Sequence, residues 1–320
     1  MPWWSMAAPD ASDAPREQSS IFDAPPGRPT LIQLARGSDA EIDCRTMARI
    51  PLEDNFDDVI NKAQRGWKIS DADLALRAEV TAADLAAVKA GQPIDAVLRR
   101  VARHLKLSPD ALEALAHKRW YPQQPIFPAG FAAFNTPYGD ITVNSYLVWD
   151  PRARVAAAFD TGATCDGMLD LIHAERLTVR YIFLTHTHED HIADLAKFAA
   201  ATKAEVWASE LEPADLPGAK TFKENAHFHL GPIAIKTLLT SGHSPGMTTY
   251  YVTGLSWPLA VVGDAVFASS MGGSATHFAE QHRNNEKKIL SLPRDTVLAC
   301  GHGPLTTLGQ EKQHNPFFAR

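Results

Sequence analysis

Three histidines and an aspartate follow a buried strand near the middle of this 320-residue chain. Residues 185–191 read Thr-His-Thr-His-Glu-Asp-His, after an apolar run at 181–184 that is typical of a buried strand. Residues 192–201 have helical spacing. Imidazole nitrogens and carboxylate oxygens are donors that zinc and similar borderline cations accept. The segment therefore predicts a loop between a strand and a helix that can serve two adjacent metal ions.

Later strand-like runs add further donors. His243, Asp264 and His302 each come at the end of such a run, and each stands beside a glycine. Glycine permits the tight turns and close backbone approach that a crowded two-metal centre needs. The predicted ligands are His186, His188, Asp190, His191, His243, Asp264 and His302.

Strands and helices alternate beyond residue 122. The predicted strands begin at Phe131 and include residues 141–148, 154–159, 179–185, 204–208, 233–239, 248–252 and 259–262. Helical spacing occurs at 166–176 and 190–201. This order predicts an α/β fold, an αββα sandwich whose site lies on one edge.

The first 122 residues have a different character. Residues 1–50 predict a flexible arm, because six of the first 30 residues are prolines among Ser, Asp and Ala. Residues 51–122 are rich in Ala and Leu at helical spacing, with Ser70 and Thr81 at positions typical of N-caps. We expect a small all-α domain there and place its boundary to residues 123–320 near 122.

Composition narrows the classes of function. The 37 acidic residues exceed the 31 basic ones, so no global positive field attracts nucleic acid or anionic membrane. Cys44, Cys165 and Cys300 form no C-x-x-C pair, which argues against a disulfide framework. The sequence contains no run of 18 apolar residues. We therefore expect a cytoplasmic protein without a membrane segment.

The motifs together resemble those of the metallo-β-lactamase superfamily. Thr-His-Thr-His-Glu-Asp-His is followed by Ser-Gly-His-Ser-Pro-Gly at 241–246, Gly-Asp at 263–264 and Gly-His-Gly-Pro at 301–304. The resemblance covers roughly residues 125–320 and implies a four-layer αββα sandwich. It implies a first metal on His186, His188 and His243, a second on Asp190, His191 and His302, and Asp264 bridging both. It also implies that Asp160 supports the ligand loop without being a ligand.

Within that superfamily, the ending at 301–309 looks like the hydroxyacylglutathione hydrolases, also called glyoxalase II. The resemblance implies a binuclear hydrolase that cleaves a thioester, lactone or other ester of a small molecule with a metal-bridging hydroxide. Asp190 and Asp264 would be catalytic. Zinc is the expected metal, with iron or manganese as alternatives. Residues 268–277 lack the Gly-Arg-Thr-Asp segment of many glyoxalase II relatives, which leaves the substrate open.

A persulfide dioxygenase with one iron is the main enzymatic alternative. Such relatives share the motif but usually carry a tyrosine-containing segment after the last histidine. Gly303 and Pro304 follow His302 here. We therefore favour the hydrolase.

A DNA-binding regulator with a metallo-β-lactamase-like sensor domain is the non-enzymatic alternative. Residues 69–91 resemble a phage-repressor helix-turn-helix, but its recognition helix at 81–88 contains no Arg, Lys, Asn or Gln for base reading. Residues 55–119 hold eleven basic and nine acidic side chains, too small an excess for a strong DNA footprint. We do not expect DNA binding. We expect instead that the helical domain is an interaction or dimerisation module, which would make the protein a homo-oligomer, or that it is a lid over the metal site.

Overall fold

The computed structural model describes residues 30–34 and 49–320. The predicted arm of residues 1–50 lies mostly outside the described residues. Within it, β1 (Thr30–Leu34) is a strand that pairs antiparallel with β2 (Phe131–Tyr138), so at these five residues the prediction of a flexible arm is wrong. Among the described helices, none is both long and apolar enough to cross a bilayer.

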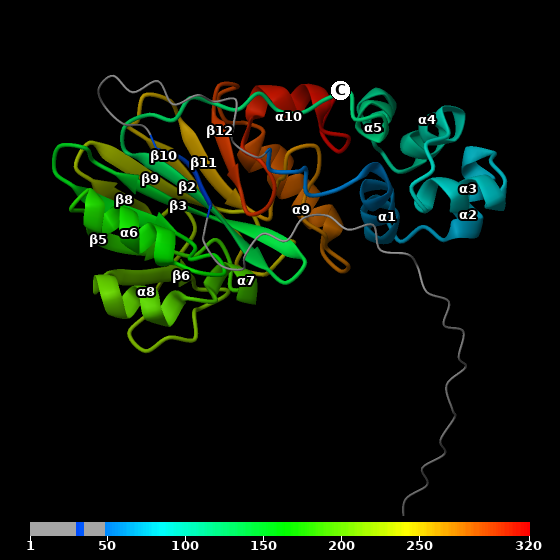
Figure 1. Cartoon of the computed structure of the whole chain (residues 1–320). Helices are drawn as coiled ribbons and strands as arrows, with labels where there is room; N and C mark the ends of the chain where they lie inside the picture. Colours follow the sequence, from blue (N-terminus) through cyan, green and yellow to red (C-terminus); the bar gives the residue numbers. More distant parts are fainter. Residues whose placement is uncertain (1–29, 35–48) are drawn as a thin grey trace, which may run out of the picture.

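Two mixed sheets form the centre of the molecule (Figure 1). The first sheet keeps chain order, from β1 and β2 through β3 (Ile141–Trp149), β4 (Val155–Phe159), β5 (Thr178–Phe183), β6 (Glu205–Ser209) and β7 (Lys220–Phe222). The second has the order β13-β12-β11-β10-β9-β8, with β8 (His227–Leu230), β9 (Ile233–Leu239), β10 (Thr248–Thr253), β11 (Leu259–Gly263), β12 (Val297–Cys300) and β13 (Thr306–Thr307).

Helices cover the outer face of each sheet. The first sheet is covered by α6 (Asp166–Ala174) and α8 (Leu195–Thr202), which bury Met168 and Phe198 against it. The second is covered by α9 (Phe278–Asn284), the π-helical turn η1 (Asn285–Ile289) and α10 (Leu308–His314). An aromatic-rich core that includes Phe159, Phe183 and Tyr250 fills the space between the sheets. The predicted four-layer αββα sandwich is thus confirmed.

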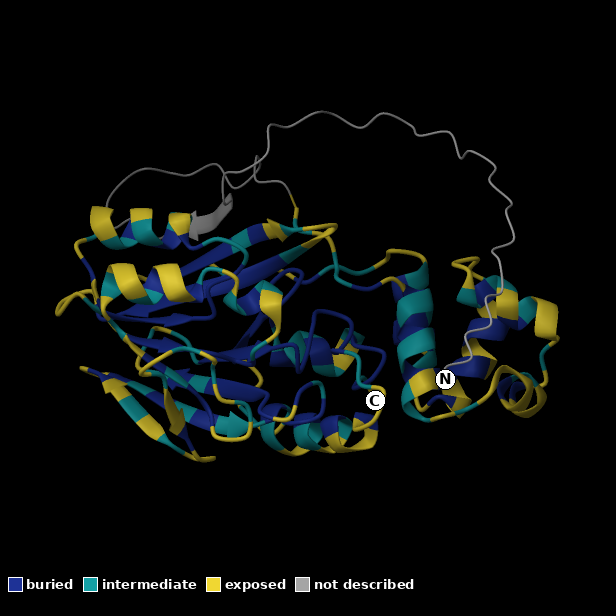
Figure 2. Ribbon diagram, turned by 90° about the horizontal axis from the view of Figure 1, so that it is seen from below, coloured by how far each residue is buried: buried dark blue, intermediate teal, exposed yellow. Residues whose placement is uncertain are grey.

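Five further helices lie beside this sandwich (Figures 1 and 2). They are α1 (Phe56–Gly66), α2 (Asp71–Ala78), α3 (Ala82–Lys89), α4 (Asp95–His104) and α5 (Pro109–Ala116), which we call the helical unit. The two predicted N-caps are confirmed, because Ser70 and Thr81 accept hydrogen bonds from the N–H groups of Asp73 and Asp84.

The helical unit shares its core with the sandwich. Val59 and Ile60 of α1 belong to the same buried cluster as Met271 and Phe278. The Phe278 ring lies so close to α1 that any side chain at Gly66 would collide with it. The unit therefore packs as a continuation of the outer layer over the second sheet.

Candidate metal centre

All seven predicted ligands come together at one edge of the sandwich. The loop after β5 leads into the short helix α7 (Glu189–Ile192) and brings four of them. His243 lies between β9 and β10, while Asp264 and His302 follow β11 and β12. Of the groups whose candidate ligand atoms lie within 4.8 Å of one another, three contain the predicted ligands: His186, His188 and His243; His186, His191 and Asp264; Asp190, His191 and His302. A fourth such group, Cys165, Asp166 and Asp194, contains none of them.

Asp264 lies between the two sides of this centre. Its Oδ2 is 3.4 Å from Nε2 of His243 and 3.5 Å from Nε2 of His302, and its Oδ1 is 3.3 Å from Nε2 of His191. Asp190 approaches only the group of His191 and His302, with Oδ2 3.2 Å from Nε2 of His302. Asp264 is therefore the carboxylate placed to reach both predicted ions.

Each of four imidazoles is oriented through its Nδ1 atom, so that Nε2 faces the centre. The partners are Thr185 Oγ1 for His186 at 3.0 Å, Asp160 Oδ2 for His191 at 2.9 Å, Gly273 O for His243 at 2.8 Å and Thr142 O for His302 at 2.7 Å. His188 differs, because its Nδ1 lies 3.1 Å from Nε2 of His243. Such outer contacts fix the ring and the tautomer of a metal-binding histidine.

Three buried atoms at the centre lack a hydrogen-bond partner. They are Nε2 of His186, Nε2 of His191 and Oδ1 of Asp264. A buried polar atom without a partner costs about 1–3 kcal/mol, so native proteins rarely leave several together. These are the atoms that a cation would bind, and the residues therefore fit the metal ions that the motifs imply.

Burial and mutual charge set the protonation of these groups. Burial holds the pKa of His186 well below its ordinary value, which keeps its ring neutral and able to bind a cation. Burial also lowers the pKa of His302, but Asp264 and Asp190 more than offset this and raise it to about 11. Burial likewise lowers the pKa of His191, but the charge of Asp264 opposes this, and the pKa rises to about 10. Metal ions would replace the protons that these two rings hold.

Asp160 lies behind the ligand loop at the end of β4. Its carboxylate accepts hydrogen bonds from the backbone N–H and the hydroxyl of Thr185, both at 2.7 Å, and contacts His191. It has a left-handed backbone with φ 55°, a conformation that asparagine and aspartate tolerate better than other side chains.

We predict that Asp160→Asn lowers metal affinity about 10- to 100-fold, because the amide cannot accept at both oxygens from Thr185 and His191. Competition titration against a chromogenic chelator measures this. The control is Asp140→Asn in the exposed turn between β2 and β3, for which we expect no change. Equal affinities for both variants and the unchanged protein would refute a supporting role for Asp160.

Glu212 is a supporting residue that the sequence did not reveal. Its Oε1 accepts from the N–H and the hydroxyl of Thr187, at 2.8 and 2.9 Å, and its Oε2 accepts from the N–H of Gly246 at 2.8 Å. It therefore ties the loop of His186 and His188 to the loop of His243. No motif marks Glu212, because both partners are distant in sequence.

Close approach explains the glycine beside His302. A side chain at Gly301 would collide with Oδ1 of Asp264 and come within 2.7 Å of the His191 ring. The predicted need for glycine near the ligands is met at this position.

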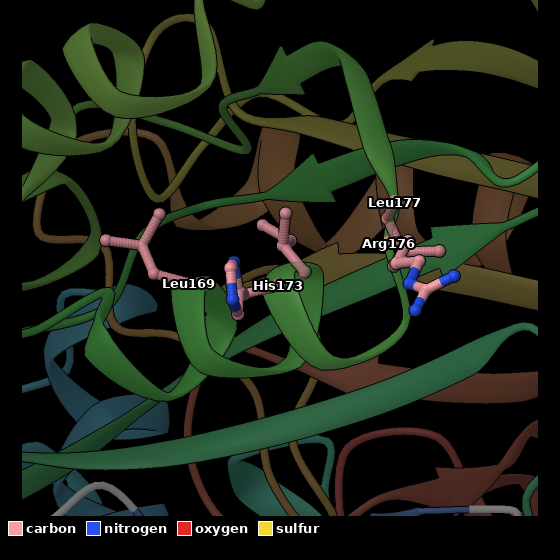
Figure 3. A pocket seen from close by; sticks show the side chains of 5 residues that line it. Leu169, His173, Arg176 and Leu177 are labelled. Atoms are coloured by element: carbon pink, nitrogen blue, oxygen red, sulfur yellow. The ribbon is translucent and has the colours of Figure 1, made fainter.

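Two further histidines and two cysteines belong to none of the three groups of predicted ligands. His227 and His229 are exposed on β8. Burial raises the pKa of the Cys165 thiol to about 12 and holds that of Cys300 well above its ordinary value, so neither thiol is a ready nucleophile. A surface hollow of about 400 Å³ on α6 contains no predicted ligand (Figure 3); its lining is Leu169, Ile172, His173, Arg176 and Leu177.

The chain is similar to known proteins over the region that carries this site. The sequence model of the Metallo-beta-lactamase superfamily matches residues 138–302. A probable metallo-hydrolase, YqgX of Bacillus subtilis, is 29% identical over 204 residues, 57% of this chain and 94% of the relative. Hydroxyacylglutathione hydrolase GloC of Haemophilus influenzae is 26% identical over 199 residues, 54% of this chain and 92% of the relative.

The chain is also similar to a solved structure. The B3 metallo-beta-lactamase BLEG-1 aligns with a TM-score of 0.52 and 28% identity, covering 59% of this chain and 100% of that one. Homologues of this kind are metal-dependent hydrolases. The family match spans half of the sequence and every predicted ligand, and the chain belongs to the metallo-beta-lactamase superfamily.

Proposed function

We propose that the protein is a binuclear metal-dependent hydrolase that cleaves a thioester or another ester-type bond. The convergence of five imidazoles and two carboxylates, with unpartnered atoms facing one another, carries this proposal. His186, His188 and His243 would hold one ion, and Asp190, His191 and His302 the other, with Asp264 between them. Zinc fits this mixture of nitrogen and oxygen donors best, with iron or manganese as alternatives.

Two bound divalent ions would supply a water with a pKa near 7 and a positive charge that polarises the scissile carbonyl. The chain's own groups do the rest. Asp190, half-buried beside His302, can orient the attacking water as a hydrogen-bond acceptor. His188 is exposed, which indicates that the substrate enters on its side. The described part of the chain offers no activated thiol there, so direct attack by water fits best.

The substrate class rests on similarity. The Haemophilus relative is named for a glutathione thioester, which supports thioesters as the first compounds to test. Residues 268–277 have no arginine that could pair with an anionic substrate. We also expect a cytoplasmic location.

A substrate panel on one metal-loaded preparation tests the proposal. It contains a thioester, a lactone, an aryl ester and a β-lactam, each measured before and after chelation. We expect turnover of at least one ester-type substrate, lost with the metals and restored by adding them back. Persulfide-dependent oxygen uptake without cleavage of any panel member would instead assign the chain to the dioxygenases.

The helical unit is predicted not to read DNA sequence. The exposed residues at the start of α3 are its N-cap Thr81 and the alanines Ala82, Ala83 and Ala86. Alanine has no hydrogen-bonding group that could read a base, and the Thr81 hydroxyl already donates to Asp84 at 2.8 Å. Arg99 of the neighbouring α4 is already paired with Asp110 and Glu113. Selection from a random DNA pool at near-physiological salt should enrich no motif. Enrichment that Arg99→Ala abolishes would restore the regulator hypothesis.

A further inference from the structure

Glu311 is a buried carboxylate on α10 that belongs to none of the described groups that could hold an ion. The residue is 1% exposed, and three hydrogen-bond donors converge on its side chain. Its Oε1 accepts from the hydroxyl of Thr306 at 2.7 Å. Its Oε2 accepts from the backbone N–H of Ser269 at 3.0 Å and from the side-chain amide of Asn315 at 2.8 Å. Donors at both oxygens fit an ionised carboxylate, which accepts hydrogen bonds and donates none.

Two of these donors belong to segments that follow predicted metal ligands. Ser269 lies in the loop after Asp264. Thr306 lies on β13, which follows the turn of His302. The carboxylate of Glu311 therefore joins the loop of one ligand to the strand that follows another.

The turn at residues 267–270 has an unfavourable backbone that these contacts hold. Ser269 is left-handed, with φ 66°, a conformation that residues with a side chain rarely adopt. Such a conformation persists only where the surrounding contacts impose it. Here the Ser269 N–H donates to Glu311, and the amide of Asn315 also donates to the carbonyl oxygens of Ser270, at 2.8 Å, and Phe267, at 3.3 Å. The turn is thus held from α10 and the residue after it.

The same turn lies against the metal centre. The ring of Phe267 packs edge-on against the ring of His302, with their centroids 5.6 Å apart. At the end of the loop, the N–H of Gly272 donates to the carbonyl of Asp264 at 3.1 Å. A Cβ atom on Gly272 would collide with that carbonyl, so the two ends of the loop are in close contact. A shift of the turn would therefore displace both Asp264 and His302.

Burial makes the charge of Glu311 sensitive to pH. Burial raises its pKa to about 7, although the hydrogen bonds from Thr306, Asn315 and Ser269 act in the opposite direction. Among the described residues, the titratable group that interacts with this charge is the Cys300 thiol. Burial holds the pKa of that thiol well above its ordinary value, so it stays neutral while Glu311 titrates.

We propose that Glu311 is a positioning residue for the metal centre, which holds Asp264 and His302 in place through charge-assisted hydrogen bonds to the segments that follow them. Hydrogen bonds to an ionised acceptor are stronger than those between neutral groups. This inference rests on the proposed function, because it concerns the binuclear centre assigned there. Family comparison alone does not lead to Glu311, since the matched region ends at residue 302.

The test compares Glu311→Gln with Glu280→Gln, the same change at an exposed position on α9. Glutamine has nearly the shape of glutamate, and its amide nitrogen can donate to a turned Thr306 hydroxyl, so Glu311→Gln reproduces the protonated side chain. Zinc affinities of the full-length proteins are measured by competition with a chromogenic chelator. At pH 8 we expect Glu311→Gln to lower the affinity for the more weakly held ion about 10- to 100-fold, and Glu280→Gln to leave it unchanged.

The pH dependence distinguishes positioning by a charge from a structural role. At pH 6 most of the unchanged protein also has a protonated Glu311, so the two proteins become more alike. The ratio of their zinc affinities should be at least about fivefold smaller at pH 6 than at pH 8. Protonation of the histidine ligands lowers both affinities alike and cancels in this ratio.

Thermal unfolding of the metal-free proteins at pH 8 gives a second readout. The pKa of Glu311 in the folded protein lies above that of an exposed glutamate, so its contribution to stability falls as the pH rises towards 7. At pH 8 the buried charge is therefore destabilising. Glu311→Gln should leave the melting temperature unchanged or raise it.

The outcomes separate this inference from the proposed function, because zinc binding is measured instead of hydrolysis. Equal affinities of Glu311→Gln and the unchanged protein at pH 8 overturn the role of Glu311 and leave the metal centre intact. A loss of the same size at both pH values, or one accompanied by a lower melting temperature, shows that Glu311 supports only the fold. Absence of zinc binding by the unchanged protein overturns both proposals. A loss at pH 8 that diminishes at pH 6, without a lower melting temperature, supports the inference even if no ester in the panel is cleaved.

Discussion

Asp264→Ala is expected to lower second-metal occupancy and to reduce turnover about a hundredfold or more. Asp264 is the carboxylate whose oxygens approach histidines on both sides of the centre, at 3.3 to 3.5 Å. Without it, two adjacent divalent cations would face each other with less negative charge between them. Metal content by elemental analysis and turnover with the best panel substrate measure the effect.

His227→Ala is the control for this variant. His227 is exposed on β8 and belongs to none of the described groups that could hold an ion. It should retain both metal and turnover. Loss of metal in His227→Ala together with full occupancy in Asp264→Ala would show that the ligand assignment is wrong.

Phe278→Ala is expected to destabilise the whole protein by about 3–5 kcal/mol, the usual cost of emptying a large buried aromatic site. The Phe278 side chain is 1% exposed and lies where α9 meets the helical unit, with its ring 5.1 Å from that of Trp67. Because both parts share this core, denaturant should unfold them in one transition before and after the change.

Leu76→Ala removes a side chain that is 78% exposed on α2 and should change stability by less than about 0.5 kcal/mol. Tryptophan fluorescence and far-UV circular dichroism, followed in parallel during urea unfolding, make the comparison. Two separate transitions, with only the first shifted by Phe278→Ala, would show that the helical unit folds independently of the sandwich.

The sheets and the ligand loop could be predicted from sequence because their signals are local. Apolar runs at 233–239 and 259–262 match β9 exactly in extent and β11 within one residue. The ligands stand at the ends of such runs, so their convergence follows from the strand ends meeting at one edge. The helix predicted at 190–201 is less accurate, because it divides into α7 and α8, with the break at residues 193–194.

Features that depend on distant contacts could not be predicted. β1 exists because it pairs with β2, about a hundred residues later, and its own surroundings are rich in proline. Glu212 gains its significance from the two loops that the fold brings beside it. The helical unit looked separable in composition, but its apolar faces are completed by α9 and Met271.

The metal content of the purified full-length protein tests the central claim most directly. Inductively coupled plasma mass spectrometry, on protein purified without chelators and dialysed against metal-free buffer, gives both the number and the identity of the ions. The seven converging ligands predict close to two divalent ions per chain, mainly zinc, and loss of hydrolysis when they are removed. A single iron per chain, with persulfide-dependent oxygen uptake and no ester cleavage, would contradict the account.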